Sequence, residues 1–228
     1  MFDPMYLVFL APGLLLSLWA SYRVRSAFGK YSQVGTANGY SGAEAAELLL
    51  QRAGISDVRV VPAHGFLSDH YNPTTKDLAL SDQVYAGRSV AAIGVAAHET
   101  GHALQHATKY APLGLRSALV PTAGIGSQLG YMVMLIGLFI HPYVVLAGIA
   151  LFSAVLLFQI VTLPVEFDAT ARAKAMVVEA GIIHPEERQG MDAVLNAAAL
   201  TYVAAVVTTL LTIVYFLFRS GLLGGRRS

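Results

Sequence analysis

The chain has 228 residues, of which 55% are hydrophobic and 13% charged, and its formal net charge is +1 at pH 7. A soluble domain is roughly 45–50% apolar and about 25% charged, so this composition excludes disorder and most soluble folds, and the low net charge excludes a general nucleic-acid partner, which would need clustered positive charge. The absence of cysteine excludes disulfides, thiol nucleophiles and thiolate metal sites, and leaves His and carboxylate side chains as the available metal ligands.

Charged residues are missing from three long stretches of the chain. These stretches lie between Asp3 and Arg23, between Arg116 and Glu166, and between Asp192 and Arg219. A helix needs about 20 apolar residues to cross the hydrocarbon core of a membrane, and the middle stretch, interrupted at His141-Pro142, is long enough for two crossings. The sequence therefore predicts four transmembrane helices, near residues 5–22, 118–140, 143–163 and 197–218. Four buried core helices are the alternative, but a soluble domain of this size is too small to hide them all.

The predicted spans and the positions of the basic residues also indicate how the chain is oriented in the membrane. No basic residue precedes the first span, whereas several follow it from Arg23 on, which is typical of an uncleaved anchor rather than a signal peptide. Four crossings put segments 23–116 and 164–196 on one side of the membrane, and most of the Lys and Arg residues lie in these segments. The positive-inside rule therefore favours a cytoplasmic location for both, although the basic tail at 219–228 argues against it.

The polar segments carry helix and strand signals. In residues 41–54 a Ser is followed three positions later by a Glu, which is a capping box, and the helical pattern ends at a Gly. Short β-type runs at 58–61 and 78–80 are flanked by turn residues and could pair as a small sheet. Residues 89–109 are Ala-rich and free of Pro, which favours a helix, and residues 164–180 are also predicted to be helical.

The motif HETGH at residues 98–102 lies in one of these predicted helices. Helix positions four apart are separated by about 40° around the axis and about 6 Å along it, so His98 and His102 can bind one metal ion from the same face. A catalytic zinc site has three protein ligands plus water, and Glu99 is placed to remove a proton from that water. Two structural histidines beside a helical Glu are the alternative, but burying an unpaired Glu99 would be costly.

A third protein ligand is required. His106 continues the four-residue spacing, but it lies about 12 Å along the axis from His98, too far to share an ion with bonds near 2 Å. It is expected to be a polar face residue or a neighbour of a ligand. Glu166 closely follows the third predicted span and returns to the side of the His pair, which makes it the better candidate. Asp168 is the alternative ligand, and a plain surface carboxylate is the alternative for either.

Several sequence strings resemble the YugP-like membrane zinc metallopeptidases. They are SDHYNP, LALS, VAAHETGHALQHA, LPVEFDATARA and LNAAALTYVAA, and together they extend over most of the chain. The resemblance implies a gluzincin-type site, with His98 and His102 as ligands, Glu99 as general base and Glu166 as the carboxylate ligand. Related membrane gluzincins have an Asp four residues after the ligand Glu, where it orients a zinc-binding His. Here that position is Thr170, so the surroundings of the ligands differ.

Other candidates rest on weaker signals. His70 and Tyr71 resemble a family string and could donate hydrogen bonds to an oxyanion, and Tyr202 could do the same or anchor at the membrane interface. Asp69 could pair with His70. The strand near residues 78–80 could align an extended peptide by backbone pairing, as edge strands do. Loop structure and interfacial aromatic residues are the plainer alternatives.

The sequence thus predicts a mainly α-helical integral membrane protein, with about four transmembrane helices and a small α+β zincin-like catalytic domain. The expected segments are an N-terminal transmembrane anchor at 1–22, a zinc-protease segment with the HExxH helix at 23–116, two transmembrane helices at 117–163, a helical segment with the third zinc ligand at 164–196, a C-terminal transmembrane helix at 197–218 and a basic tail at 219–228.

The predicted function is that of a zinc-dependent endopeptidase of the cell membrane, with Zn²⁺ as cofactor and Glu99 as general base. Its expected substrates are membrane-associated or unfolded proteins close to the membrane surface. A zinc-binding membrane scaffold without useful turnover is one alternative, in which the metal joins two segments of the chain. A transporter or channel is another, but it is disfavoured because the spans hold none of the Asp, Glu, Lys and Arg residues that usually mark such pathways.

Overall fold

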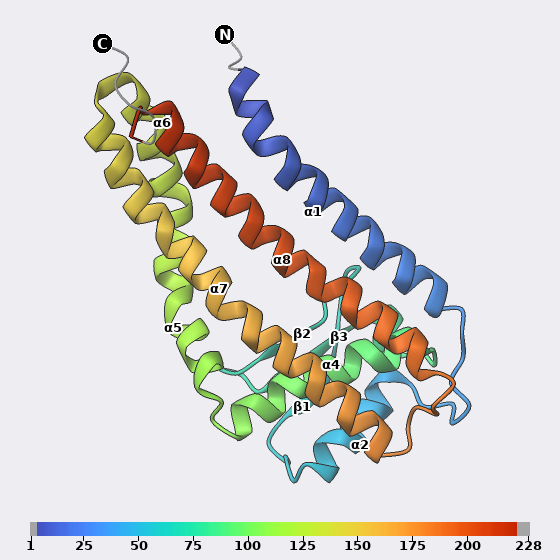
Figure 1. Cartoon of the computed structure of the whole chain (residues 1–228). Helices are drawn as coiled ribbons and strands as arrows, with labels where there is room; N and C mark the ends of the chain where they lie inside the picture. Colours follow the sequence, from blue (N-terminus) through green and yellow to red (C-terminus); the bar gives the residue numbers. More distant parts are fainter. Residues whose placement is uncertain (1–3, 223–228) are drawn as a thin grey trace. The chain divides into compact units, whose positions relative to one another are not determined.

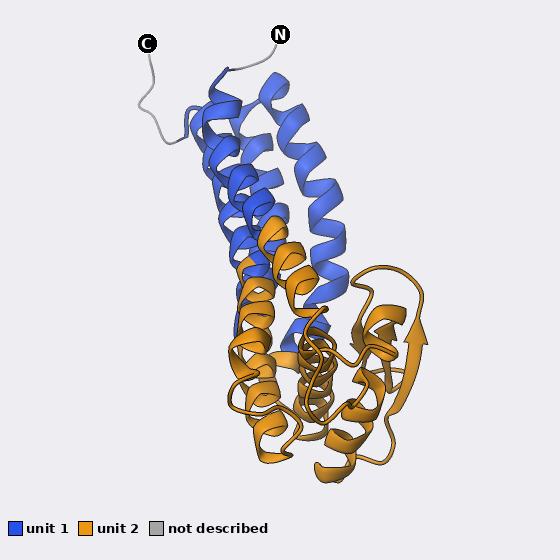
Figure 2. Cartoon of the chain, turned by 90° about the vertical axis from the view of Figure 1, so that its right-hand side faces the viewer, with its two compact units in different colours: residues 1–20, 114–164, 201–228 blue, residues 21–113, 165–200 orange. Residues whose placement is uncertain are grey.

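The computed structural model describes residues 4–222, and the chain divides into two compact units. Figure 2 shows unit 1, composed of residues 1–20, 114–164 and 201–228, and unit 2, composed of residues 21–113 and 165–200. The first residues of the predicted anchor and the last residues of the predicted basic tail lie outside the described residues.

Four helical stretches within residues 4–222 are long and apolar enough to cross a membrane, as predicted. They are α1 (Pro4–Tyr31), the consecutive elements α5 (Ala111–Ile125), η1 (Gly126–Gly130, a π-helical turn) and α6 (Tyr131–Ile140), then α7 (Pro142–Glu179), and α8 (Arg188–Arg219) (Figure 1). The predicted break at His141-Pro142 is confirmed, because His141 has an extended backbone and α7 starts with Pro142. A proline fits the first helical turn, where its missing N–H costs nothing.

Helix α7 is longer than the sequence indicated. The third predicted span and the helical segment that was expected to start at Pro164 form one continuous helix, with Pro164 inside it. Glu166 therefore lies on the same helix as the third predicted span. In the same way, α8 begins at Arg188 and continues through the last predicted span.

Unit 1 is held together by apolar and small side chains. Its buried cluster contains Met134, Val145, Ile149, Ile213, Tyr215 and Phe216. Glycines permit close backbone approach within it: a Cβ on Gly126 would lie 2.5 Å from the carbonyl oxygen of Leu151, and one on Gly148 would lie 2.5 Å from the backbone nitrogen of Met134. Close approach at small residues is the usual way in which membrane helices pack, since lipid tails are as apolar as the side chains they would replace.

Unit 2 combines helices with a small sheet. Its remaining elements are α2 (Gly42–Arg52), β1 (Arg59–Ala63), β2 (His70–Asn72), β3 (Asp77–Ser81), α3 (Asp82–Tyr85) and α4 (Val90–Ala107). The predicted pairing of the two short β-type runs is confirmed, because β1 and β3 pair in parallel, with Val61 opposite Ala79. The prediction that the strand near residues 78–80 is an edge is wrong: β3 is the central strand, since β2 pairs with its other side in antiparallel fashion.

The start of α2 confirms the predicted capping box. The Ser41 hydroxyl accepts a hydrogen bond from the backbone N–H of Glu44 at 3.2 Å, and the Glu44 carboxylate accepts one from the backbone N–H of Ser41 at 2.8 Å. The helix ends beside Gly54, whose φ of +70° suits a residue without a side chain. Helix α2 packs its apolar face against α4, so it supports the helix that carries the HETGH motif.

Candidate metal site

Helix α4 places the two motif histidines on one face. Its first turn is capped by Ser89, whose hydroxyl accepts a hydrogen bond from the backbone N–H of Ala92 at 3.2 Å. The helix is rich in Ala and mostly buried, so it is fixed by packing on several sides. One turn apart, His98 and His102 have ring centroids separated by 4.8 Å. The motif thus forms the helical pair of imidazoles that its spacing predicts.

Helix α7 approaches α4 closely beside this pair. A Cβ on Gly101 would lie only 2.5 Å from the carbonyl oxygen of Ala169, so glycine is required for the two helices to come this near. Ala169 is fully buried, and Glu166, one helical turn earlier, is only 1% exposed. The contact at Gly101 therefore brings a buried carboxylate to the two histidines.

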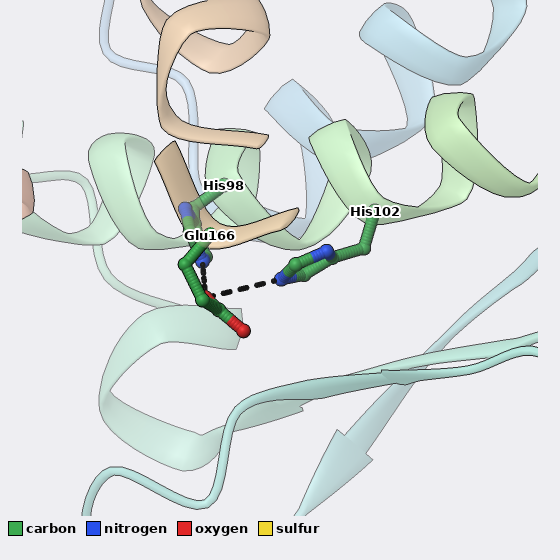
Figure 3. A group of neighbouring side chains, drawn as sticks. All are labelled: His98, His102 and Glu166. Carbon is green, nitrogen blue, oxygen red and sulfur yellow. Dashed lines mark hydrogen bonds and ion pairs between the residues drawn. The ribbon is translucent and has the colours of Figure 1, made fainter. Parts of the chain in front are cut away.

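The three side chains converge on one point (Figure 3). Oε2 of Glu166 lies 3.2 Å from Nε2 of His98 and 3.5 Å from Nε2 of His102. Bonds of about 2.0–2.1 Å to a tetrahedral zinc ion would place neighbouring donor atoms about 3.3 Å apart. The observed separations agree with that spacing, so the donor set and its dimensions fit a zinc ion.

The electrostatics of the cluster favour a cation. Burial by itself would lower the pKa of His102, but the hydrogen bond to Glu166 and the negative charges of Glu99 and Glu166 outweigh it and raise that pKa. Glu99 is itself only 8% exposed. A raised imidazole pKa means that the surroundings stabilise positive charge at this position, and a metal cation supplies the same kind of charge.

Each histidine has a partner on its other ring nitrogen. Nδ1 of His98 lies 3.2 Å from the Thr170 hydroxyl. Nδ1 of His102 lies 3.0 Å from Oε1 of Gln105. Asp168, the alternative ligand, is outside the three-residue cluster and contacts the amide nitrogen of Gln105 at 2.8 Å. Sequence reasoning missed Gln105; the signal that could have found it is its position three residues after His102, on the same helix face.

The remaining candidates near the motif take other partners. His106, expected to be a neighbour of a ligand or a face residue, shares a hydrogen bond of 2.7 Å with the hydroxyl of Tyr71. His70 is exposed, and its Nδ1 lies 2.8 Å from the carbonyl oxygen of Ser68. Tyr202 lies on α8 and belongs to unit 1. The structure does not bring these residues into the cluster of His98, His102 and Glu166.

Asp69, which was expected to pair with His70, forms its hydrogen bonds with Ser81, and His70 acts on it only through electrostatic attraction. Its carboxylate accepts hydrogen bonds from the backbone N–H of Ser81 at 2.7 Å and from the Ser81 hydroxyl at 3.0 and 3.1 Å. Burial raises the pKa of Asp69, although these Ser81 donors oppose the effect. The side chain thereby ties the loop before β2 to the end of β3.

A helical His pair, completed by a buried Glu from a second helix in a chain with four apolar helices, is the arrangement of a membrane-bound HExxH metallopeptidase. Residues 6–221 match the model of a protein family described as "Putative neutral zinc metallopeptidase", and the chain belongs to this family. The metal of the family is zinc.

A curated relative supports the same assignment. The chain is 46% identical over 202 residues to "Putative membrane protease YugP" of Bacillus subtilis (strain 168), and the match covers 88% of this chain and 90% of the relative. No solved structure matches the chain. The predicted resemblance to the YugP-like metallopeptidases is therefore confirmed.

Proposed function

We propose that this protein is a zinc-dependent membrane endopeptidase, with His98, His102 and Glu166 as metal ligands and Glu99 as general base. The observation that carries the proposal is the convergence of two imidazole nitrogens on one buried carboxylate oxygen that comes from a different helix. Membership of a zinc peptidase family agrees with this assignment.

The chemistry follows from the positions of these side chains. When bound, zinc supplies a Lewis acid that lowers the pKa of water toward neutrality and polarises a carbonyl group. Glu99, beside His98 in the sequence and close enough to influence the pKa of His102, takes the proton as the water oxygen attacks the carbonyl carbon. It then delivers that proton to the amide nitrogen as the carbon–nitrogen bond breaks. The low exposure of Glu99 limits competing proton exchange with bulk water.

The substrates that we propose are membrane-associated or unfolded proteins that reach the membrane surface. Glu166 lies only a few residues beyond the predicted span 143–163 on the unbroken helix α7, and a helix rises about 1.5 Å per residue. Cleavage would therefore take place close to the bilayer. A faster rate on a membrane-anchored peptide than on the same peptide in solution would support this assignment, and equal rates would remove its basis.

We also propose on which side of the membrane the two polar segments lie. Segments 23–116 and 164–196 would be cytoplasmic, because they hold most of the Lys and Arg residues. Cysteine residues introduced singly at exposed positions of these segments should be labelled by a membrane-impermeant reagent only after the cells are opened. Labelling in intact cells would show that these segments lie outside the cell, which is the opposite orientation.

Two variants test the catalytic assignment. Purified Glu99→Gln should retain stoichiometric zinc and lose nearly all peptidase activity, because the amide cannot accept the proton. Glu166→Ala should lose both zinc and activity, because one of three protein ligands is missing. Equal activity of Glu99→Gln and wild type would refute the base assignment, and unchanged zinc in Glu166→Ala would refute the ligand assignment. A zinc-bound wild type without measurable turnover would support the scaffold alternative.

A further inference from the structure

We propose that Gln105 is a positioning residue of the metal site: its side-chain amide fixes which nitrogen of His102 faces the metal and ties the helix of the two histidines to the helix of Glu166. The inference rests on the ligand set proposed above. It adds a residue that neither the HExxH motif nor the family description assigns.

The orientation of the Gln105 amide is determined by its donors. The amide nitrogen lies 2.8 Å from the carbonyl oxygen of Val165 and 2.8 Å from Oδ2 of Asp168, both of which can only accept. Both N–H groups are thus used. Turning the amide over would set its oxygen against these two acceptors, so the nitrogen must face α7 and the oxygen must face His102.

This orientation determines the tautomer of His102. Oε1 of Gln105 is an acceptor and lies 3.0 Å from Nδ1 of His102, so Nδ1 must carry the hydrogen. In the neutral form that binds a metal, the imidazole keeps only this one N–H, and Nε2 therefore presents its lone pair toward Oε2 of Glu166, 3.5 Å away. Two acceptors that face each other at this distance are stabilised by a cation between them. The amide thus prepares Nε2 to be a metal ligand.

The same amide links the two ligand-bearing helices. Its two acceptors, Val165 and Asp168, flank Glu166 along α7, whereas Gln105 itself lies on α4. Asp168 is held in turn by Arg172, whose Nε lies 2.6 Å from the same Oδ2, and the Arg172 guanidinium lies 5.5 Å from the ring centroid of Tyr110. Gln105 is fully buried, so water cannot replace these bonds. The amide therefore sets the separation between His102 and Glu166.

The test measures metal binding rather than activity. Gln105→Met keeps the size of the side chain and removes its hydrogen bonds, and Asp168→Ala removes one acceptor at a less buried position. Loss of such supporting partners typically weakens metal affinity 10–100-fold. We expect a decrease of that size for Gln105→Met and a smaller one for Asp168→Ala, measured by competition with a zinc chelator in the full-length purified protein. Gln51→Met, an exposed change on α2, is the matched control and should leave the affinity unchanged.

Two further readouts separate positioning from general loss of structure. If Gln105 acts through Asp168, the double variant should bind zinc no more weakly than Gln105→Met alone. The cobalt-substituted Gln105→Met protein should also show a shifted visible absorption spectrum, because the His102 ring is no longer held. Additive losses together with an unchanged cobalt spectrum would overturn the proposal, as would wild-type zinc affinity in Gln105→Met. The variant His102→Ala separates a failure of the ligand set from a failure of the role of Gln105. If His102→Ala retains zinc, the proposed ligand set is wrong. If His102→Ala loses zinc but Gln105→Met does not, only the role of Gln105 is refuted.

Discussion

The contact between Gly101 and Ala169 gives a sharp prediction for Gly101→Ala. A Cβ at this position would lie 2.5 Å from the Ala169 carbonyl oxygen, whereas ordinary contacts begin at 3.4 Å. The nearest atoms all belong to backbone, so no side chain can rotate away. The two helices must therefore separate locally by up to about 0.9 Å, because repulsion rises steeply below contact distance.

That separation exceeds what the proposed zinc site would tolerate. Zinc–ligand distances are held to within about 0.2 Å, and Glu166 lies one turn from Ala169 on the helix that must move. Overpacking of this kind costs about 1–3 kcal/mol, while the better helix propensity of Ala returns up to about 1 kcal/mol. We therefore expect a modest loss of stability in the metal-free protein and a much larger loss of zinc affinity.

The assay compares Gly101→Ala with wild type by zinc content after dialysis and by thermal unfolding with and without a chelator. Gly94→Ala on the same helix is the control, since its Cβ would meet the flexible side chain of Met191 at 3.0 Å rather than backbone. It should keep its zinc. Stoichiometric zinc in Gly101→Ala, together with a wild-type unfolding temperature, would refute the argument that close helix approach positions Glu166.

Two predictions concern the rest of unit 2. Ser41→Ala removes the cap of α2 and should lower the free energy of unfolding by about 1 kcal/mol; an unfolding temperature equal to that of wild type would show that Glu44 alone sustains the helix start. Burial raises the pKa of Asp69 above 3.8, so the Asp69 carboxyl holds its proton more tightly in the folded protein than in the unfolded chain. Protonated Asp69 therefore contributes stability at low pH, and this contribution is lost as pH rises through the raised pKa. Asp69→Asn cannot titrate and can still accept from the Ser81 N–H, so its unfolding temperature should rise relative to wild type between pH 4 and pH 7. A difference that does not change with pH would contradict this account, and zinc loss at low pH affects both proteins alike.

Local sequence patterns predicted much of the fold and the centre of the candidate site. The four apolar helices follow from uncharged stretches whose length matches a membrane, and the break at His141 follows from the proline after it. The α2 capping box and the placement of His98 and His102 on one helix face follow from spacings of three and four residues. The capping box and the His pair depend on neighbours within about one helical turn, and the apolar helices depend only on residues that follow one another in the chain.

Features that depend on distant segments were not predictable in the same way. The two acceptors of the Gln105 amide are the Val165 carbonyl and Asp168, which are brought near only by the packing of α7 on α4. Whether a short strand lies at the centre or the edge of a sheet depends on which other strand pairs with it, and β2 is too short to give a clear signal. The close approach at Gly101 likewise depends on Ala169 of α7, which is distant in the sequence.

The unbroken course of α7 has a consequence for how the protein is made. The ribosome releases His98 and His102 before the second and third apolar stretches have entered the bilayer, and Glu166 emerges only after both. If the proposed ligand set holds, a chain in which one of these crossings fails would leave its carboxylate on the wrong side of the membrane and could not assemble a complete zinc centre. A nascent or misinserted chain would then have no peptidase activity. Activity would arise only once all of the membrane helices are inserted.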